Sequence, residues 1–214
     1  MKVEIWSDVM CPFCYIGKKR FEKGLAAFEQ RDSVVIEWKS FLLNPGLKTD
    51  TSLSPADYLV QAKGMSPEQA RQANAQVTAM ARQEGLDYHL DKAVLANTLQ
   101  AHRLLQLAKE KGKANEMEEL LFSAYFTEGK NIDDTDTLQQ LGQAAGLQPG
   151  DITVALTNES YLDKVQGDLY EAQQIGVRGV PYFVFNDRYV ISGAQAGETF
   201  LGALNKAWEE RSGE

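Results

Sequence analysis

The sequence predicts an α/β fold in which a mixed α/β domain is interrupted by a large, all-helical insertion. Three observations predict it. A short apolar strand leads directly into a helix near the start of the chain, helical periodicity fills the middle, and alternating strand patterns return in the last third. The expected boundaries are 1–48 and 159–214 for the mixed domain and 49–158 for the inserted helical domain.

The N-terminal segment has the order strand, helix, strand. Residues 3–6 form an apolar strand, which Ser7 and Asp8 end. Pro12 fits the first turn of the following helix, where its missing N–H costs nothing. A second strand is expected over 34–43 because apolar and polar residues alternate there. Residues spaced by seven, four and three positions define the buried face of the helix: Cys14, Phe21, Leu25 and Phe28.

The middle of the chain is predicted to be helical throughout. Ser54-Pro55 and Ser66-Pro67 are typical helix starts, and Gln69 completes a capping box with Ser66. Three further helices are expected over 91–111, 118–126 and 135–145.

The last third returns to mixed structure. A helix that ends at Gly176 precedes a buried strand over 182–185. Asn186 and Asp187 form a hairpin turn to a partner strand over 189–191. A C-terminal helix is then lined by Phe200, Leu201, Leu204 and Trp208.

Composition excludes several classes of function. The 214 residues are 43% hydrophobic and 24% charged, as in ordinary globular proteins. A net charge of −8 argues against nucleic acid and against an anionic membrane surface as partners. No apolar run reaches the roughly 18 residues that a membrane span requires. The first residues read as a strand rather than as a secretory leader, so we expect a cytoplasmic protein.

The two cysteines, Cys11 and Cys14, indicate the chemistry. A C-x-x-C pair at a helix start places one sulfur at the positive end of the helix dipole, which favours its thiolate. The second sulfur, one turn on, can displace whatever the first has captured. Only His89 and His102 could complete a zinc site, and their spacing is not that of a finger, so no metal is expected. The pair predicts a dithiol oxidoreductase.

A second motif, Gly179-Val180-Pro181, directly precedes the strand over 182–185. Together with the strand and the Cys-Pro-Phe-Cys helix, it resembles the thioredoxin superfamily, and the helical insertion resembles its DsbA-like branch. A closer resemblance is to the FrnE-type dithiol oxidoreductases. It rests on residues 7–17, Asn97-Thr98, Ala101-His102-Arg103-Leu104, Ala124-Tyr125-Phe126 with Glu128-Gly129, and Ser192-Gly193-Ala194-Gln195.

The resemblance implies a thioredoxin fold and a role for each motif residue. Cys11 would be an exposed nucleophile and Cys14 the resolving thiol. Val180 would precede a cis Pro181 and pair its backbone with an extended substrate or with glutathione. Pro12 and Phe13 would tune the redox poise, and Pro-Phe is closer to the Pro-Tyr of glutaredoxins than to the Pro-His of strongly oxidising enzymes. The second cysteine pair that some relatives have is missing from this chain.

Other residues keep two interpretations. His102 lies on an apolar helix face and is either a satisfied core histidine or, with Pro12, Phe13, Val180 and Pro181, part of the substrate site. Asp8 either modulates the ionisation of Cys11 or forms an Asx turn at the strand end. Asn97 needs no function, because capping or surface solvation explains it.

The expected function is a thiol–disulfide reductase or isomerase that forms a mixed disulfide with a protein or small molecule. No bound cofactor is expected; glutathione is a possible thiol co-substrate, and glutathione or a reductase would recycle the pair. One alternative is a glutathione-dependent enzyme of the kappa transferase or 2-hydroxychromene-2-carboxylate isomerase type, although such enzymes typically lack a cysteine at the position of Cys11. The other is a non-catalytic binding or chaperone module that uses the exposed Phe13.

Overall fold

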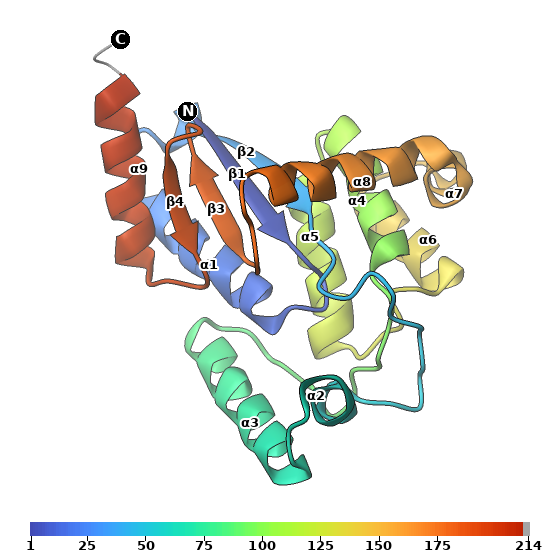
Figure 1. Ribbon diagram of the computed structural model, residues 1–214. Coiled ribbons are helices and arrows are strands. Elements are labelled where there is room, and N and C mark those ends of the chain that lie inside the picture. The colour runs from blue at the N-terminus through green and yellow to red at the C-terminus, as the bar shows by residue number, and fades with distance from the viewer. Residues whose placement is uncertain (212–214) are drawn as a thin grey trace.

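In the computed structural model, which describes residues 1–211, four strands form one sheet in the order β2-β1-β3-β4 (Figure 1). Their bounds are Lys2–Ser7 for β1, Val35–Ser40 for β2, Tyr182–Phe185 for β3 and Tyr189–Ser192 for β4. β1 is parallel to β2 and antiparallel to β3, so that Ile5 lies between Trp38 and Phe183. Of the two central strands, β1 thus comes from the start of the chain and β3 from the last third.

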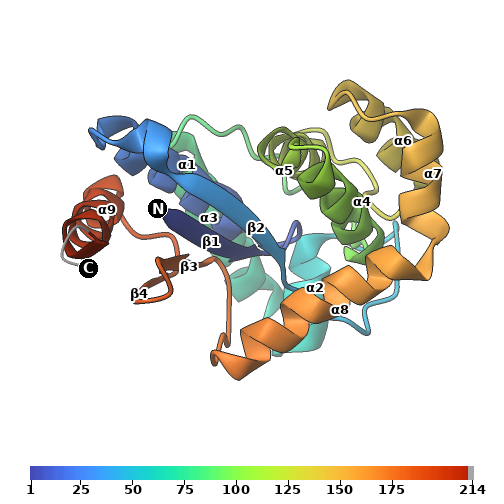
Figure 2. The ribbon, with the colours of Figure 1, turned by 90° about the horizontal axis from the view of Figure 1, so that it is seen from above.

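Alternation along the strands gives the sheet two apolar faces, each covered by helices. α1 (Pro12–Ala27) and α9 (Gly197–Arg211) cover one face, and α8 (Glu159–Gln174) covers the other (Figure 2). The first face holds Val3, Ile5, Phe183 and Phe185 against Phe21, Phe28, Phe200 and Leu204. Gly24 lets α1 and α9 approach closely, because a β-carbon there would lie 2.6 Å from the carbonyl oxygen of Gly197. This is the thioredoxin fold that the sequence predicts.

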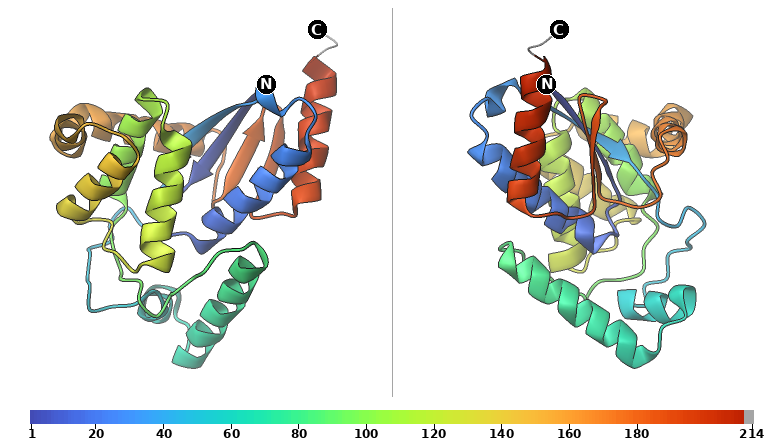
Figure 3. Two further views of the ribbon diagram at one scale, coloured as in Figure 1. Left: turned by 180° about the vertical axis from the view of Figure 1, so that it is seen from behind. Right: turned by 60° about the vertical axis from the view of Figure 1, so that its left-hand side comes forward.

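Between β2 and α8 the chain forms the helical block. Its helices are α2 (Pro55–Lys63), α3 (Pro67–Gln83), α4 (Leu99–Glu110), α5 (Ala114–Phe122), α6 (Thr135–Ala144) and α7 (Pro149–Thr157). The α2–α3 hairpin lies at the end of the molecule away from both termini, and α4 to α7 lie beside the sheet (Figures 1 and 3). The insertion is therefore confirmed, whereas its boundaries at 49 and 158 stay a prediction. No helix within residues 1–211 is both long enough and apolar enough to cross a bilayer.

Local rules predicted the helix starts of the hairpin well. The Ser54 and Ser66 side chains accept hydrogen bonds from the backbone N–H of Asp57 and Gln69, and both reciprocal bonds of the capping boxes are present. Gly64 ends α2 in the left-handed conformation. In the β3–β4 hairpin, Asn186 and Asp187 have φ angles of 49° and 57°, as a tight turn between strands requires.

The strand expected over 34–43 is shorter, and long-range contacts explain why. β2 ends at Ser40 because its parallel partner β1 ends at Ser7. The backbone N–H of Leu43 donates instead to the Asp8 carboxylate, at 2.7 Å. The strand pattern in the sequence continues past the point at which a partner strand exists.

The helix expected over 91–111 is wrong in its first turns. α4 begins at Leu99, where the Asn97 side chain accepts a hydrogen bond from the Leu99 N–H at 2.8 Å. Upstream, Asp50 and Leu95 pair their backbones as an isolated β-bridge, which holds this segment extended.

Two other helical predictions need correction. The helix expected over 118–126 begins at Ala114 and ends in a π-helical turn, Ser123–Thr127. The sequence reasoning also missed α7, which has Pro149 in its first turn.

Candidate active site

Cys11 lies at the corner between β1 and α1. It is the N-cap residue of α1, and its N–H donates to the Asp8 carbonyl oxygen at 2.9 Å. The Cys14 N–H donates to the Cys11 carbonyl oxygen at 3.0 Å, which starts the helix. Both cysteines are free thiols. The corner therefore places the Cys11 sulfur at the helix N-terminus, where the helix dipole favours a negative charge.

The expectation of an exposed Cys11 is wrong, because only 5% of the residue is accessible. The segment that precedes β3 covers it. The Cys11 thiol donates to the Val180 carbonyl oxygen at an Sγ–O distance of 3.5 Å. The Val180–Pro181 peptide bond is cis, as the resemblance implied. The structure thus brings together the two motifs that the sequence indicates, residues 11–14 and 179–181. The sequence did not indicate that the second motif buries Cys11.

Cys14 is the more deeply buried thiol, with 1% of the residue exposed. Burial, followed by the neighbouring Cys11 sulfur, raises the pKa of the Cys14 thiol well above its usual value. The backbone N–H of Asp8 and the hydroxyl of Ser7 act in the opposite direction and lower this pKa. The two cysteines thus differ as a dithiol mechanism requires: one sulfur at the helix N-terminus, the other held protonated behind it.

Aromatic side chains of the helical block close the site from behind. The Tyr88 hydroxyl donates to the Pro12 carbonyl oxygen at 2.7 Å. The Tyr88 ring stacks between Tyr15 and Phe126, with centroid distances of 6.1 and 4.7 Å. Burial, with smaller effects of Cys11 and Cys14, raises the pKa of Tyr88, so its hydroxyl stays protonated. Both cysteines belong to the apolar core of the helical block, not to that of the sheet.

An apolar surface adjoins the cysteines. Phe13 is 43% exposed, in the position expected of a substrate contact. Pro12 and Met10, close to it along the chain, are half-buried, and so is Val180, which lies against Cys11. Leu43, held by Asp8, is exposed to the same extent as Phe13. The arrangement suits an extended, apolar segment of a substrate.

Asp8 and His102 meet below this surface. The His102 Nε2 atom lies 3.4 Å from Asp8 Oδ1, and neither side chain is more than 1% exposed. Asp8 Oδ1 also accepts from the Met10 N–H at 3.4 Å, which is the Asx-turn contact expected at the strand end. His102 therefore lies behind the site rather than on its surface, and its contact with a substrate stays a prediction.

A charged cluster joins α1 to α5 close to this pair. The buried Lys18 ammonium contacts Glu22 at 2.5 Å and Glu119 at 2.6 Å. Burial raises the pKa of Glu119, but hydrogen bonds from Lys18, Lys19 and Tyr15 outweigh it and lower the value to about 2. The neighbouring Glu118 is fully buried with one unpartnered oxygen, and burial raises its pKa to about 8.

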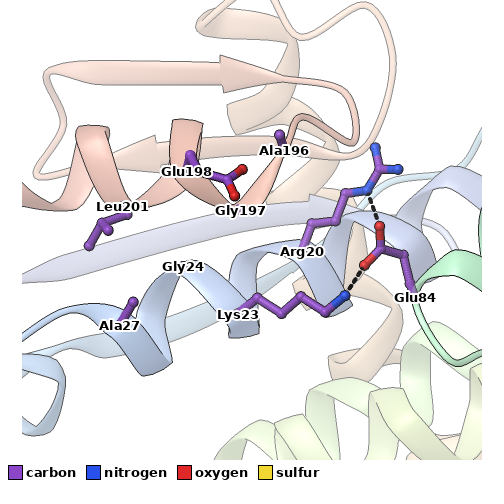
Figure 4. Close-up of a pocket in the computed structure, with 9 residues that line it drawn as sticks. All are labelled: Arg20, Lys23, Gly24, Ala27, Glu84, Ala196, Gly197, Glu198 and Leu201. Carbon is purple, nitrogen blue, oxygen red and sulfur yellow. Dashed lines mark hydrogen bonds and ion pairs between the residues drawn. The ribbon is translucent and has the colours of Figure 1, made fainter.

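A separate cavity of about 330 Å³ lies between α1 and the start of α9 (Figure 4). Arg20 and Lys23 project into it, and both form ion pairs with Glu84. Neither cysteine lines this cavity. Both of these cations are thus already engaged by Glu84, and the cavity is not part of the thiol site.

Sequence reasoning missed Ser7, Gly17 and Tyr88 as parts of the site. A glycine inside a helix indicates a close approach, which could have identified Gly17. Ser7 ends the predicted strand and, like Gly17, belongs to the motif over 7–17, but the sequence gives neither residue a role of its own. Tyr88 has no local signature, since it reaches Pro12 from 76 positions away in the chain.

The family model described as a DSBA-like thioredoxin domain matches residues 2–205. The uncharacterized protein YwbO of Bacillus subtilis strain 168 is 30% identical over 205 residues, which cover 95% of each chain. The crystal structure of the probable DsbA oxidoreductase SCO1869 from Streptomyces coelicolor is 40% identical, with a TM-score of 0.92 over 98% of this chain and 91% of that one.

A more distant likeness concerns the fold alone. The cytosolic disulfide reductase DsbM from Pseudomonas aeruginosa, in a structure with GSH, is 13% identical, with a TM-score of 0.69. The match covers 98% of this chain and 100% of DsbM.

Proposed function

The chain belongs to the DsbA-like thioredoxin family of disulfide oxidoreductases, and from that premise we propose that Cys11 and Cys14 exchange disulfides through a mixed-disulfide intermediate. The observation that supports the proposal best is the asymmetry of the pair. Cys11 lies at a helix N-terminus against the Val180 carbonyl, and Cys14 lies one turn deeper with a raised pKa.

In the first step, the Cys11 thiolate attacks a substrate disulfide, R–S–S–R′. The bond from Cys11 to one substrate sulfur forms, the substrate S–S bond breaks, and R′–S⁻ leaves with the electron pair and takes up a proton. The helix N-terminus favours the attacking charge, and the Val180 backbone lies where an extended substrate can pair with it.

In the second step, Cys14 loses its proton and attacks the Cys11 sulfur. The Cys11–Cys14 disulfide forms, and the second substrate thiolate leaves and is protonated. The substrate has gained two electrons and the enzyme pair has lost them. In the reverse direction, the oxidised pair oxidises a dithiol. The direction depends on the reduction potential of the Cys11–Cys14 pair relative to the redox potential of its compartment.

The residues around Cys11 suggest the class of substrate. We propose a disulfide or dithiol of a protein or small molecule as substrate, bound along Phe13, Val180 and Pro181, with no resident cofactor. Glutathione is the proposed thiol co-substrate, and glutathione or a reductase the recycling partner. DsbM, which shares the fold, is cytosolic, and the same compartment and a FrnE-type reductase or isomerase role are proposed for this chain.

Two alternatives are tested by the same variants. A glutathione-dependent isomerase would use the fold without redox turnover and needs no second thiol, so the presence of Cys14 beside Cys11 argues against it. A binding module would use the apolar surface around Phe13 alone. Cys11→Ser should abolish exchange in the oxidoreductase, slow an isomerase partly and leave a binding module intact.

The deciding experiment traps the intermediate. Cys14→Ser, mixed with an oxidised peptide, should accumulate a covalent adduct on Cys11 that mass spectrometry detects, whereas Cys11→Ser should form none. The parent protein, equilibrated in glutathione buffers, should form an intramolecular disulfide. The glutathione-dependent alternative would gain if no such disulfide formed across potentials from about −320 to −180 mV.

A further inference from the structure

Ser7, the last residue of β1, has a buried hydroxyl whose hydrogen-bonding capacity is unused in the resting protein. The residue is 1% exposed, and its Oγ atom has no hydrogen-bond partner among the described residues. A buried hydroxyl that makes no hydrogen bond is destabilising, so its presence calls for an explanation. The only ionisable group whose pKa this hydroxyl is shown to lower is the Cys14 thiol.

The neighbouring strand supplies a direct contrast. Ser40 on β2 pairs with Ser7 in the sheet register and is equally enclosed, at 3% exposure. Its hydroxyl accepts a hydrogen bond from Gln106 Nε2 at 2.9 Å. Two serines at the same end of adjacent strands therefore differ in one respect: the Ser40 hydroxyl has a hydrogen-bond partner, whereas the Ser7 hydroxyl has none and acts on the Cys14 thiol.

The second chemical step creates the partner that Ser7 lacks. Cys14 must become a thiolate in a place that water does not reach, since the residue is 1% exposed. A thiol offers a hydroxyl only a weak acceptor, whereas a thiolate accepts a charge-assisted hydrogen bond. The backbone N–H of Asp8 also acts on this sulfur and lowers the pKa of its thiol, and a second donor would stabilise the thiolate further.

Other groups that face Cys14 cannot take this role. The Tyr88 hydroxyl is already donated to the Pro12 carbonyl oxygen. Cys11 is bonded to the substrate sulfur during the second step and has neither a charge nor a proton to offer. Ser7 is thus the side-chain donor that remains among the groups shown to act on this thiol.

We propose that the Ser7 hydroxyl, together with the Asp8 N–H, forms a hydrogen-bonding pocket for the Cys14 thiolate and thereby speeds release of the substrate from the mixed disulfide. The inference rests on the proposed function and deepens it. Ser7 touches no substrate and acts only after Cys11 has reacted. It leaves the atom balance of the second step unchanged: Cys14 gives up one proton, and the departing substrate thiolate takes one up.

A single probe separates the two steps. One molecule of 5,5′-dithiobis(2-nitrobenzoate), mixed with excess reduced protein, releases one coloured thiolate when Cys11 attacks and a second when Cys14 resolves the adduct. In Ser7→Ala the first phase should keep the parent's rate. The second should slow about 10-fold, the effect of losing one hydrogen bond to a charge. The midpoint of the pH dependence of the second phase should rise by about one pH unit.

Matched variants make the result specific. Ser40→Ala, the same change at the paired position, should leave both phases unchanged. Ser7→Thr, which keeps the hydroxyl, should retain a second phase within about threefold of the parent's. Because Ser7→Ala removes no hydrogen bond that the folded protein makes, its melting temperature should equal or exceed the parent's.

Three results would overturn the inference: equal second phases in Ser7→Ala and Ser40→Ala, a first phase slowed as much as the second, or a Ser7→Thr variant as slow as Ser7→Ala. A parent protein that releases only one equivalent would instead contradict the dithiol mechanism itself, and the inference with it. If the parent protein shows two phases but the variants give one of the three contradicting results, the inference fails and the dithiol mechanism stands.

Discussion

Gly17 packs directly against Pro181: a β-carbon at Gly17 would lie 2.8 Å from the proline Cγ atom. This contact joins the helix that bears Cys11 and Cys14 to the loop that covers them. It lies next to the hydrogen bond between the Cys11 thiol and the Val180 carbonyl oxygen.

Gly17→Ala should push α1 and the proline loop apart. We expect a loss of about 1–3 kcal/mol in the free energy of unfolding from overpacking, and slower attack of Cys11 on a disulfide probe. Gly167→Ala is the matched control, because nothing lies within 4 Å of a β-carbon in that exposed turn of α8. It should stabilise the protein by about 0.5–1 kcal/mol. Equal effects of the two substitutions would show that the close contact is unimportant.

Glu118 should make the folded protein less stable as pH rises. Its pKa is raised from 4.5 to about 8, so between these values the folded state retains a proton that the unfolded state has lost. The free energy of unfolding should therefore fall from about pH 4.5 to pH 8 and level off above. Glu118→Gln should flatten this slope in denaturant titrations at several pH values. Glu116→Gln, on the exposed face of the same helix, should not; an unchanged slope in Glu118→Gln would refute the assignment.

Asp168 on α8 should be a major determinant of stability. Its Oδ2 atom accepts from the Ser40 N–H at 2.7 Å and from Gln106 Nε2 at 2.6 Å, within a buried region. Asp168→Ala leaves both donors without this partner and should cost about 2–4 kcal/mol by chemical denaturation. Asp163→Ala, at an exposed position of the same helix, should change stability by less than about 0.5 kcal/mol.

Phe13 should matter for peptides and not for small disulfides. Its exposed ring can be covered by an extended substrate, and removing it should raise KM for a peptide disulfide about fivefold, equivalent to about 1 kcal/mol of lost apolar burial. Hydroxyethyl disulfide, too small to reach the ring, should be reduced at the parent's rate. Val154→Ala on α7, at a residue of 47% exposure, is the control and should affect neither substrate.

The sequence predicted those parts of the fold that local chemistry determines. Ser66 and Gln69 cap α3 as expected, and Pro12 begins α1. Long-range contacts decided the rest. The start of α4 depends on the pairing of Leu95 with Asp50, and nothing in the helical periodicity of 91–98 reveals it.

The site shows the same division. Cys11, Cys14, Val180 and Pro181 were identified from two motifs, and the structure brings Cys11 into contact with Val180. The burial of Cys11 was not foreseen, because it depends on how closely the second motif approaches the first. Buried groups such as Glu118 lie on ordinary helix faces in the sequence, and only the packing of other elements on α5 buries this carboxyl and raises its pKa.

Cys11 and the carbonyl group that covers it are 169 residues apart in the chain. At a synthesis rate of about 5–20 residues per second, the ribosome therefore synthesises Cys11 on the order of 10 s before Val180, whose carbonyl group covers it. During that interval the nascent chain presents two uncovered thiols to the cell's oxidants, and the site is enclosed only when β3, the last strand to pair with β1, has been made. Truncated or stalled chains would retain the reactive cysteines without the loop that directs them to a substrate.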